Sequence, residues 1–376
     1  MPTMTHLRTQ PHAGEPTRRD QGADRREVTG GVDTHNDTHT AAALDGAGGL
    51  LGHRQFPATP TGHTALLAWL RGFGQLVKIG IEGSGAYGAG LTEFLQTAGI
   101  TLVEVDRPDR TTRRRHGKSD PVDAEAAARA AQAGTASGVP KTRGGRVDAL
   151  RALRVARRSA VTTRAHTQTQ MKSLIVTAPD PLRTQLRGLG DRELIAHCAT
   201  RRPDRAAAAD PAVATVLALR ALARRHQHLT SEITELDTLI APLVAALNPA
   251  LLALPGVGPD IAGQLLTTAG DNPHRLHSEA AFAMLCGAAP LPASSGRTHR
   301  HRLNRGGDRQ ANAALHRIVI CRLRWDPRTR AYTQRRITEG LSKPEIIRCL
   351  KRYITREIYT ALLNPRPSND VDTDKR

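Results

Sequence analysis

The chain contains 376 residues and has a formal net charge of +19, because 54 lysines and arginines outnumber 35 aspartates and glutamates. This length accommodates two or three domains, and no stretch approaches the roughly 18 apolar residues of a membrane span. Four widely spaced cysteines without a CxxC pair disfavour a disulfide framework or a zinc ribbon and indicate reduced thiols. The first 26 residues lack the apolar run of a secretion signal, so we expect a cytoplasmic protein. The excess of positive charge predicts a polyanionic partner.

The N-terminal part of the chain predicts a mixed sheet. After a basic tail over residues 1–27, expected to be disordered, the apolar runs VTGGVD, HTAAALD and LLGHRQF predict a meander of strands. A helix in TGHTALLAWLRGF, a strand in VKIGIE, a helix in AYGAGLTEFLQTAG and a strand in TLVEVD follow. The order β-β-β-α-β-α-β, then a further helix, predicts an α/β domain over residues 28–135 with the layout of the ribonuclease H-like fold.

The remainder of the chain is predicted to be mainly helical. Residues 136–248 contain one long helix with a basic face and a second helix that starts at Asp210, a cap residue, and Pro211. Apolar residues three and four apart from Leu219 to Leu247 predict a coiled coil, with an intramolecular hairpin against the first long helix as the alternative. Pro242 is expected to kink or end the last turn. Residues 249–363 form a compact third domain, before a disordered tail over 364–376.

Four acids occupy positions that suit a divalent metal. Asp33 and Glu82 end predicted strands, and Asp120 and Asp123 lie three apart at the start of a helix. Hard oxygen ligands are those that Mg²⁺ prefers, and phosphoryl transfer needs such ions to activate one oxygen and neutralise another. The alternative for Asp120 and Asp123 is ordinary helix capping and interaction with the helix dipole, which is compatible with metal binding.

Two other patterns near these acids have simpler explanations. The run of Asp33, His35, Asp37 and His39 could offer ligands to a transition metal, but alternation along a turn and a strand is the simpler interpretation. A GxGxxG pattern begins at Gly83, yet three strands precede it and a glutamate directly before the first glycine would repel a bound pyrophosphate.

Basic residues fall in blocks that predict contacts with a phosphate backbone. Aromatic residues make up 3% of the chain, which disfavours base stacking and favours backbone and shape contacts. The candidate nucleic-acid-binding residues lie in the loop 107–118, on the first long helix and in the loop 290–312, and are Arg113, Arg114, Arg115, Lys118, Arg151, Arg154, Arg158, Arg297, Arg300 and Arg302.

Two segments of the C-terminal region could contact DNA directly. LPGVGPDIAG (254–263) is similar to a helix-hairpin-helix, in which backbone N–H groups at a helix start face a phosphate, although a plain helical hairpin has the same pattern. Ser295 precedes a glycine in an arginine-rich loop, whose guanidinium groups would stabilise charge on phosphoryl oxygens during attack by the hydroxyl. From spacing alone, it is an ordinary loop serine.

Several motifs in order resemble the IS-one-ten insertion-sequence family. They are GVDTH, IEGSGAYG, GKSDPVDAEAAARA, LPGVGPDIAG, GAAPLPASSG and NRGGDRQANAAL, within residues 28–360. The family comprises bacterial DEDD transposases described as bridge-RNA-guided recombinases. The resemblance implies a RuvC-like domain of ribonuclease H fold, a coiled-coil region and a C-terminal transposase domain. Its four acids fall on Asp33, Glu82, Asp120 and Asp123, and its nucleophilic serine on Ser295, with Ser294 adjacent.

The resemblance also implies a mechanism and partners. Ser295 would attack a DNA phosphodiester and form a phosphoserine while Mg²⁺ bound by the acids assists. A structured RNA would pair with donor and target DNA, and a homo-oligomer, a dimer or tetramer, would let different subunits contribute to one site. Two alternatives remain: a RuvC-like nuclease of the junction-resolvase type that uses water while Ser295 is inert, and a non-catalytic nucleic-acid-binding protein whose acids cap and pair.

Overall fold

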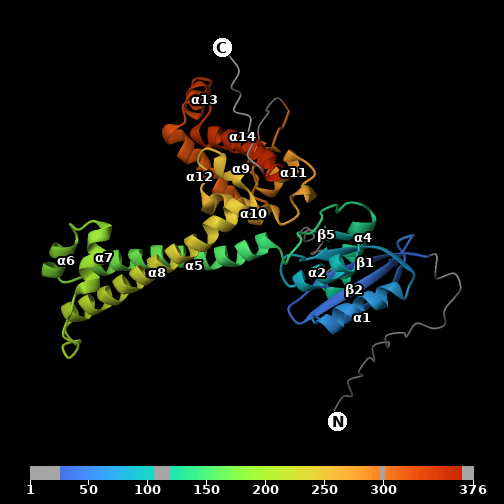
Figure 1. Cartoon of the computed structure of the whole chain (residues 1–376), viewed down its shortest axis with the longest axis horizontal. Helices are drawn as coiled ribbons and strands as arrows, with labels where there is room; N and C mark the ends of the chain where they lie inside the picture. Colours follow the sequence, from blue (N-terminus) through green and yellow to red (C-terminus); the bar gives the residue numbers. More distant parts are fainter. Residues whose placement is uncertain (1–25, 106–118, 297–300, 366–376) are drawn as a thin grey trace, which may run out of the picture. The chain divides into compact units, whose positions relative to one another are not determined.

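The computed structural model describes residues 26–105, 119–296 and 301–365. The chain divides into two compact units, Met1–Arg143 and Gly144–Arg376 (Figure 1). Each unit has hydrophobic core residues of its own. Of the helices in the described part of the chain, none is both long and apolar enough to cross a membrane.

The first unit contains the predicted mixed sheet. The strand order is β3-β2-β1-β4-β5, in which β2 is antiparallel to both of its neighbours and β1, β4 and β5 are parallel. The predicted meander and the two later strands are therefore confirmed. The strands are β1 (Glu27–Thr34), β2 (Thr38–Asp45), β3 (Leu50–Pro57), β4 (Gln75–Glu82) and β5 (Leu102–Val105).

Helices cover both faces of this sheet. Alternate residues of β1, including Val28 and Val32, pack into a core with α1 (Pro60–Arg71) and α2 (Ala89–Thr97). The residues between them face the opposite side, where α4 (Asp120–Gln132) lies. Figure 1 shows α1 and α4 on opposite sides of the strands.

Helix α4 approaches the sheet closely because two glycines leave room for it. A Cβ on Gly31 would lie 2.2 Å from the carbonyl oxygen of Ala124, and one on Gly80 would lie 2.4 Å from that of Ala127. The helix presents a buried row of alanines to these strands. Glycine on β1 and β4 and alanine on α4 therefore set the distance between helix and sheet.

A pair of stacked histidines lies in the opposite layer of this unit. The rings of His39 on β2 and His63 on α1 are stacked with centroids 5.5 Å apart, and Phe94 contacts His63. His39 is 1% exposed, and neither of its ring nitrogens has a hydrogen-bond partner among the described residues. Burial and the neighbouring His63 lower the pKa of His39 from 6.5 to about 4.

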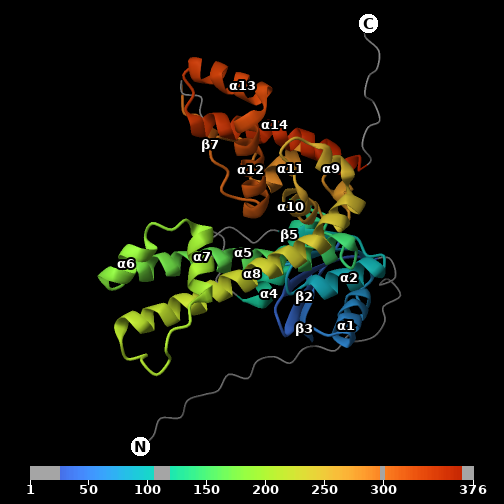
Figure 2. The same cartoon turned by 60° about the vertical axis from the view of Figure 1, so that its left-hand side comes forward.

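The second unit begins with a long helical hairpin. Helices α5 (Arg146–Val176) and α8 (Pro211–Leu247) lie side by side, with α6 (Asp180–Leu186) and α7 (Asp191–Thr200) at one end (Figures 1 and 2). Leu219, Leu229 and Ile233 of the predicted heptad seam are buried within this chain. The seam therefore forms an intramolecular hairpin, the alternative interpretation of the sequence. Asp210 caps α8 as predicted, but the helix does not end at Pro242, because it continues to Leu247.

The hairpin and the C-terminal helices share one core. Leu150 of α5 and Ile240 of α8 pack in the same cluster as residues of α10, α12 and α14. The predicted division at residues 248 and 249 thus crosses a continuous core. The C-terminal elements are α9 (Pro249–Ala253), α10 (Pro259–Ala269), a 3-10 turn η2 (Pro273–Arg275), α11 (Glu279–Leu285), β6 (Leu291–Pro292), β7 (His301–Arg302), α12 (Arg309–Trp325), α13 (Pro327–Thr338) and α14 (Lys343–Leu363).

Gly31→Ala is expected to destabilise the first unit by about 3 kcal/mol, because the new Cβ overlaps backbone atoms of α4 that cannot move independently. Urea unfolding followed by Trp69 fluorescence, in a Trp325→Phe background, measures this loss. Gly46→Ala is the control, since the nearest atom to its Cβ, in Glu27, is 3.9 Å away. Equal stability of the two variants would contradict this account of the packing.

Acidification is expected to destabilise the first unit through His39. The unfolded chain binds a proton at His39 near pH 6.5, whereas the folded chain resists protonation until about pH 4. The contribution of this neutral histidine is therefore complete above pH 6.5 and is lost as the pH falls towards 4, by about 3 kcal/mol. His39→Phe should flatten the pH dependence of unfolding, whereas His53→Phe, at an exposed site on β3, should leave it unchanged. A His39→Phe variant with the original pH dependence would argue against this role.

Candidate active site

Two of the predicted acids lie side by side at the ends of neighbouring parallel strands. Asp33 of β1 and Glu82 of β4 are partners in the strand register, and their exposures are 7% and 6%. Each lies two residues beyond a glycine that faces α4, so both side chains project towards that helix. The hydroxyl of Thr34 donates to the carbonyl oxygen of Glu82 at 2.8 Å and ties the two strand ends together.

The other two acids belong to the first turn of α4. Ser119 is the N-cap residue, and within the described part of the chain its side chain makes no capping hydrogen bond. Asp123 is 6% exposed and faces the sheet, whereas the side chain of Asp120 is 40% exposed. Capping of the backbone therefore does not explain these carboxylates, although their charge still suits the helix dipole.

His35 joins this group, although the simpler interpretation of its run in the sequence left it out of the predicted site residues. Its Nε2 lies 3.1 Å from Oδ2 of Asp33 and 3.3 Å from Oδ1 of Asp120. The backbone N–H of His35 donates to the carbonyl oxygen of Thr38 in the turn after β1, which brings the ring back over the strand end. The sequence motif GVDTH contains both Asp33 and His35, but the contact between their side chains depends on the geometry of this turn.

The predicted acids are brought to one edge of the sheet but do not all form one tight cluster. Among the described residues, the set whose possible ligand atoms all lie within 4.8 Å of one another is Asp33, His35 and Asp120. Glu82 and Asp123 flank this set. Of the alternating run of acids and histidines, Asp33 and His35 belong to this set, whereas Asp37 is exposed and His39 belongs to the opposite layer.

The electrostatics of this edge favour a bound cation. Burial raises the pKa of Asp33, His35 opposes this shift, and the neighbouring Asp123 and Asp120 raise the pKa further. A divalent ion would relieve the repulsion among these carboxylates. The oxygen donors fit Mg²⁺, which takes one or two carboxylates and keeps much of its water. In the structure His35 occupies one oxygen of each of two of these carboxylates, so an ion sharing those oxygens would have to displace the ring.

The candidate nucleophile lies in the second unit. Ser294 and Ser295 are both exposed in the connection between β6 and β7. Gly296 directly after Ser295 has φ +54, a conformation that favours glycine, and a Cβ added there would meet no atom of the described residues within 4 Å. Arg302 on β7 is exposed beside this connection, while Arg297 and Arg300 lie outside the described residues.

The predicted basic residues of the first long helix do not act alike. Arg151 and Arg158 are exposed on α5, and Arg151 pairs with Asp148. The side chain of Arg154 is 11% exposed, and its Nη1 lies 2.8 Å from Oδ1 of Asp260. Arg154 therefore has a structural role in place of the predicted nucleic-acid contact. Arg113, Arg114, Arg115 and Lys118 lie outside the described residues.

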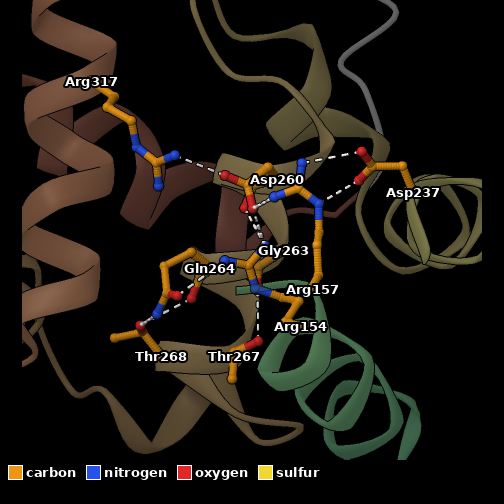
Figure 3. A network of polar contacts seen from close by, with 9 residues as sticks. All are labelled: Arg154, Arg157, Asp237, Asp260, Gly263, Gln264, Thr267, Thr268 and Arg317. Atoms are coloured by element: carbon orange, nitrogen blue, oxygen red, sulfur yellow. Dashed lines mark hydrogen bonds and ion pairs between the residues drawn. The ribbon is translucent and has the colours of Figure 1, made fainter. Parts of the chain in front are cut away.

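Asp260 at the start of α10 is the centre of a polar network. Figure 3 shows Arg154 and Arg157 of α5 and Arg317 of α12 directed at its carboxylate. Burial alone would raise the pKa of Asp260, but the three guanidiniums outweigh it and lower the pKa. The carboxylate of Asp260 thus already pairs with the guanidinium groups near the start of α10, where a phosphate would otherwise bind. The geometry of LPGVGPDIAG therefore favours the plain helical hairpin over the phosphate-binding alternative.

Two family profiles match the segments that carry these features. A profile of DEDD transposases of the IS110 type, described as a transposase, matches residues 30–178, which include the four acids and His35. A second profile, described as the Transposase IS116/IS110/IS902 family, matches residues 248–334, which include Ser295. The chain is thus a transposase of the DEDD class.

The chain belongs to the IS110 family of transposases. It is 32% identical over 117 residues to the insertion element IS110 uncharacterized 43.6 kDa protein of Streptomyces coelicolor, covering 31% of this chain and 29% of the relative. It is 30% identical over 142 residues to the insertion element IS900 uncharacterized 42 kDa protein of Mycobacterium paratuberculosis, covering 37% and 35%. The alignments thus span about a third of each relative's length.

Asp260→Asn is expected to destabilise the second unit by about 3 kcal/mol, because it leaves the buried guanidinium of Arg154 without a countercharge. Chemical unfolding followed by Trp325 fluorescence, in a Trp69→Phe background, measures the change. Asp191→Asn is the matched control, since its ion pair with Lys172 is exposed on both sides and should contribute nothing measurable. If both variants unfold alike, the network is not a source of stability.

Proposed function

We propose that this protein cuts and rejoins DNA during transposition, by phosphoryl transfer at a metal centre formed by Asp33, Asp120, Glu82 and Asp123 and through Ser295 as the nucleophile. The observation that carries the proposal is the crowding of Asp33, Asp120 and His35 at the strand ends, in the segment matched by the DEDD transposase profile. A ribonuclease H-like, RuvC-like fold for the first unit is part of the proposal, and its strand order supports it.

Each proposed step conserves bonds. The Ser295 oxygen attacks a DNA phosphorus and loses its proton, while a sugar oxygen leaves and gains one. The strand is then held as a phosphoserine diester. A sugar hydroxyl of the second DNA strand attacks the same phosphorus, and the serine hydroxyl is restored. The carboxylates of Asp33, Asp120, Glu82 and Asp123 would hold Mg²⁺, which would supply Lewis acidity to the reaction. His35 orients the carboxylates of Asp33 and Asp120 through its contacts with both.

The proposed partners are donor and target DNA, a structured guide RNA and further copies of this chain. The net charge of +19 supports a nucleic-acid partner, and the exposed Arg151 and Arg158 on α5 are available to contact its backbone. Guidance by a bridge RNA and assembly into a dimer or tetramer come from the family resemblance. We propose them on that ground.

A metal-dependent nuclease that uses water is the second candidate. The acids and His35 lie in the first unit, and Ser295 lies in the second. An acidic centre within one unit can activate a water molecule without the serine. In that case cleavage would proceed without a protein–DNA adduct.

Asp33→Asn is expected to lower strand exchange roughly a hundredfold or more, because the centre loses a charged metal ligand. Removal of divalent ions with a chelator should have the same effect, and added Mg²⁺ should restore activity. The readout is recombination between donor and target plasmids in the presence of the guide RNA encoded by the element. Asp37→Asn is the control, since that acid is exposed on the adjacent turn, where its carboxylate accepts a hydrogen bond from the side chain of Asn36.

Ser295→Ala tests the nucleophile in the same experiment. It should abolish exchange together with a protease-resistant serine–DNA adduct, whereas Ser294→Ala should keep both. Cleavage that persists in Ser295→Ala and is lost in Asp33→Asn would identify the nuclease instead. Exchange that persists in both Asp33→Asn and Ser295→Ala would refute the proposed function.

A further inference from the structure

A cavity of about 910 Å³ lies at the base of the ribbon that carries Ser295. One wall consists of Pro290 before β6, with His301 and Arg302 of β7 and the residues that follow. The opposite wall is the exposed side of α14 and the end of α13. Elements about 50 residues apart in the sequence therefore form this cavity, which lies entirely within the second unit.

The lining of the cavity is strongly basic. One lining residue, Glu345, is acidic, and the cationic lining residues are Arg302, Arg336, Arg348, Lys351, Arg352 and Arg356. Three of these cations have carboxylate partners outside the lining, Glu339 for Arg336 and Glu279 for Arg352 and Arg356. Arg348 lies 3.9 Å from Glu345, so Arg302 and Lys351 are the cationic lining residues without a carboxylate partner among the described residues.

Lys351 is a buried cation that lacks a carboxylate partner among the described residues. It is 7% exposed, and its Nζ donates to Oδ1 of Asn312 at 2.9 Å. The amide nitrogen of Asn312 donates to the carbonyl oxygens of Cys286 and Gly287 and so fixes which end of the amide faces Lys351. Burial and the nearby Arg348 lower the pKa of Lys351. An anion in the cavity would compensate this charge, which a neutral amide cannot do.

An aromatic ring lies on the same side of the cavity. Tyr353 is 49% exposed, although aromatic residues make up 3% of the chain. Tyr332 contacts it edge to face with centroids 5.5 Å apart, and the guanidinium of Arg356 lies 5.7 Å from its centroid. An exposed ring held in this way offers a surface for a nucleic-acid base, next to cations that suit a phosphate.

We propose that this cavity binds an unpaired nucleotide of the DNA strand, with its base against Tyr353 and its phosphate towards Lys351 and Arg348. The volume suits one nucleotide taken out of a duplex stack, and not a paired duplex. DNA is the favoured strand because the ribbon bearing Ser295 forms the wall of the cavity. The assignment to DNA rests on the proposed function of Ser295.

Protection of Cys349 from a thiol reagent gives a local test. Cys349 lines the cavity, and Cys321, which is also partly exposed but does not line it, is an internal control. The full-length protein in a Ser295→Ala background is mixed with a 12-mer of single-stranded DNA, its duplex or the RNA of the same sequence. Modification of each cysteine is then followed by peptide mass. Single-stranded DNA should slow modification of Cys349 about tenfold and leave Cys321 unchanged.

Variants of the cavity should remove this protection. Tyr353→Ala and Arg348→Gln should each raise the DNA concentration needed for half-protection about tenfold, whereas Tyr353→Phe should retain it. Arg330→Gln, an exposed arginine of α13 outside the cavity, is the charge control. Circular dichroism confirms that each variant is folded.

Three outcomes would overturn the proposal. They are equal protection by duplex and single strand, protection by RNA at a tenfold lower concentration than DNA, and full protection in Tyr353→Ala. Because Ser295 is absent in every arm, the result does not depend on catalysis. Failure of the nucleophile assignment and failure of the cavity assignment are thus separate observations.

Discussion

The packing of α4 against β1 and β4 is the contact on which the acidic centre depends. Gly31 and Gly80 allow the alanine face of the helix to lie against the strands, at distances that any Cβ would prevent. Asp33 and Glu82 follow these glycines by two residues, so they face the first turn of the same helix. Close packing of glycines and alanines thereby brings carboxylates from β1, β4 and α4 to one edge of the sheet.

Much of the first unit could be predicted from the sequence because most of its strands are short apolar or alternating runs separated by turn residues. The order of strands and helices along the chain and the position of Asp33 and Glu82 near strand ends follow from those runs, whereas the order of the strands within the sheet comes from the structure. His35 could not be selected in this way, since its ring reaches Asp33 and Asp120 only through the turn bonded to Thr38. The buried strand ends therefore fix the positions of Asp33 and Glu82, whereas the position of the His35 ring depends on the conformation of a turn.

The second unit shows why charge patterns along a helix are weaker guides. Arg151, Arg154 and Arg158 look equivalent in the sequence, but Arg154 has a partner in Asp260, 106 residues away. The heptad pattern of α8 was real, yet the buried partners of Leu229 and Ile233 lie in this chain. The cavity beside Tyr353 could not be predicted from the sequence either, because its two walls come from segments that are distant in the chain. Each of these features depends on contacts between residues far apart in the chain, and a periodic sequence pattern does not identify the contacting residues.

The shared core between the hairpin and the C-terminal helices has a mechanical consequence. Leu150 and Ile240 are packed with residues of α10 and α12, and the carboxylate of Asp260 joins guanidiniums from α5 and α12. The base of the hairpin is therefore fixed to α10 and α12 by apolar packing as well as by ion pairs. Displacement of the hairpin relative to these helices would therefore expose apolar core residues and separate the ion pairs of Asp260 at the same time.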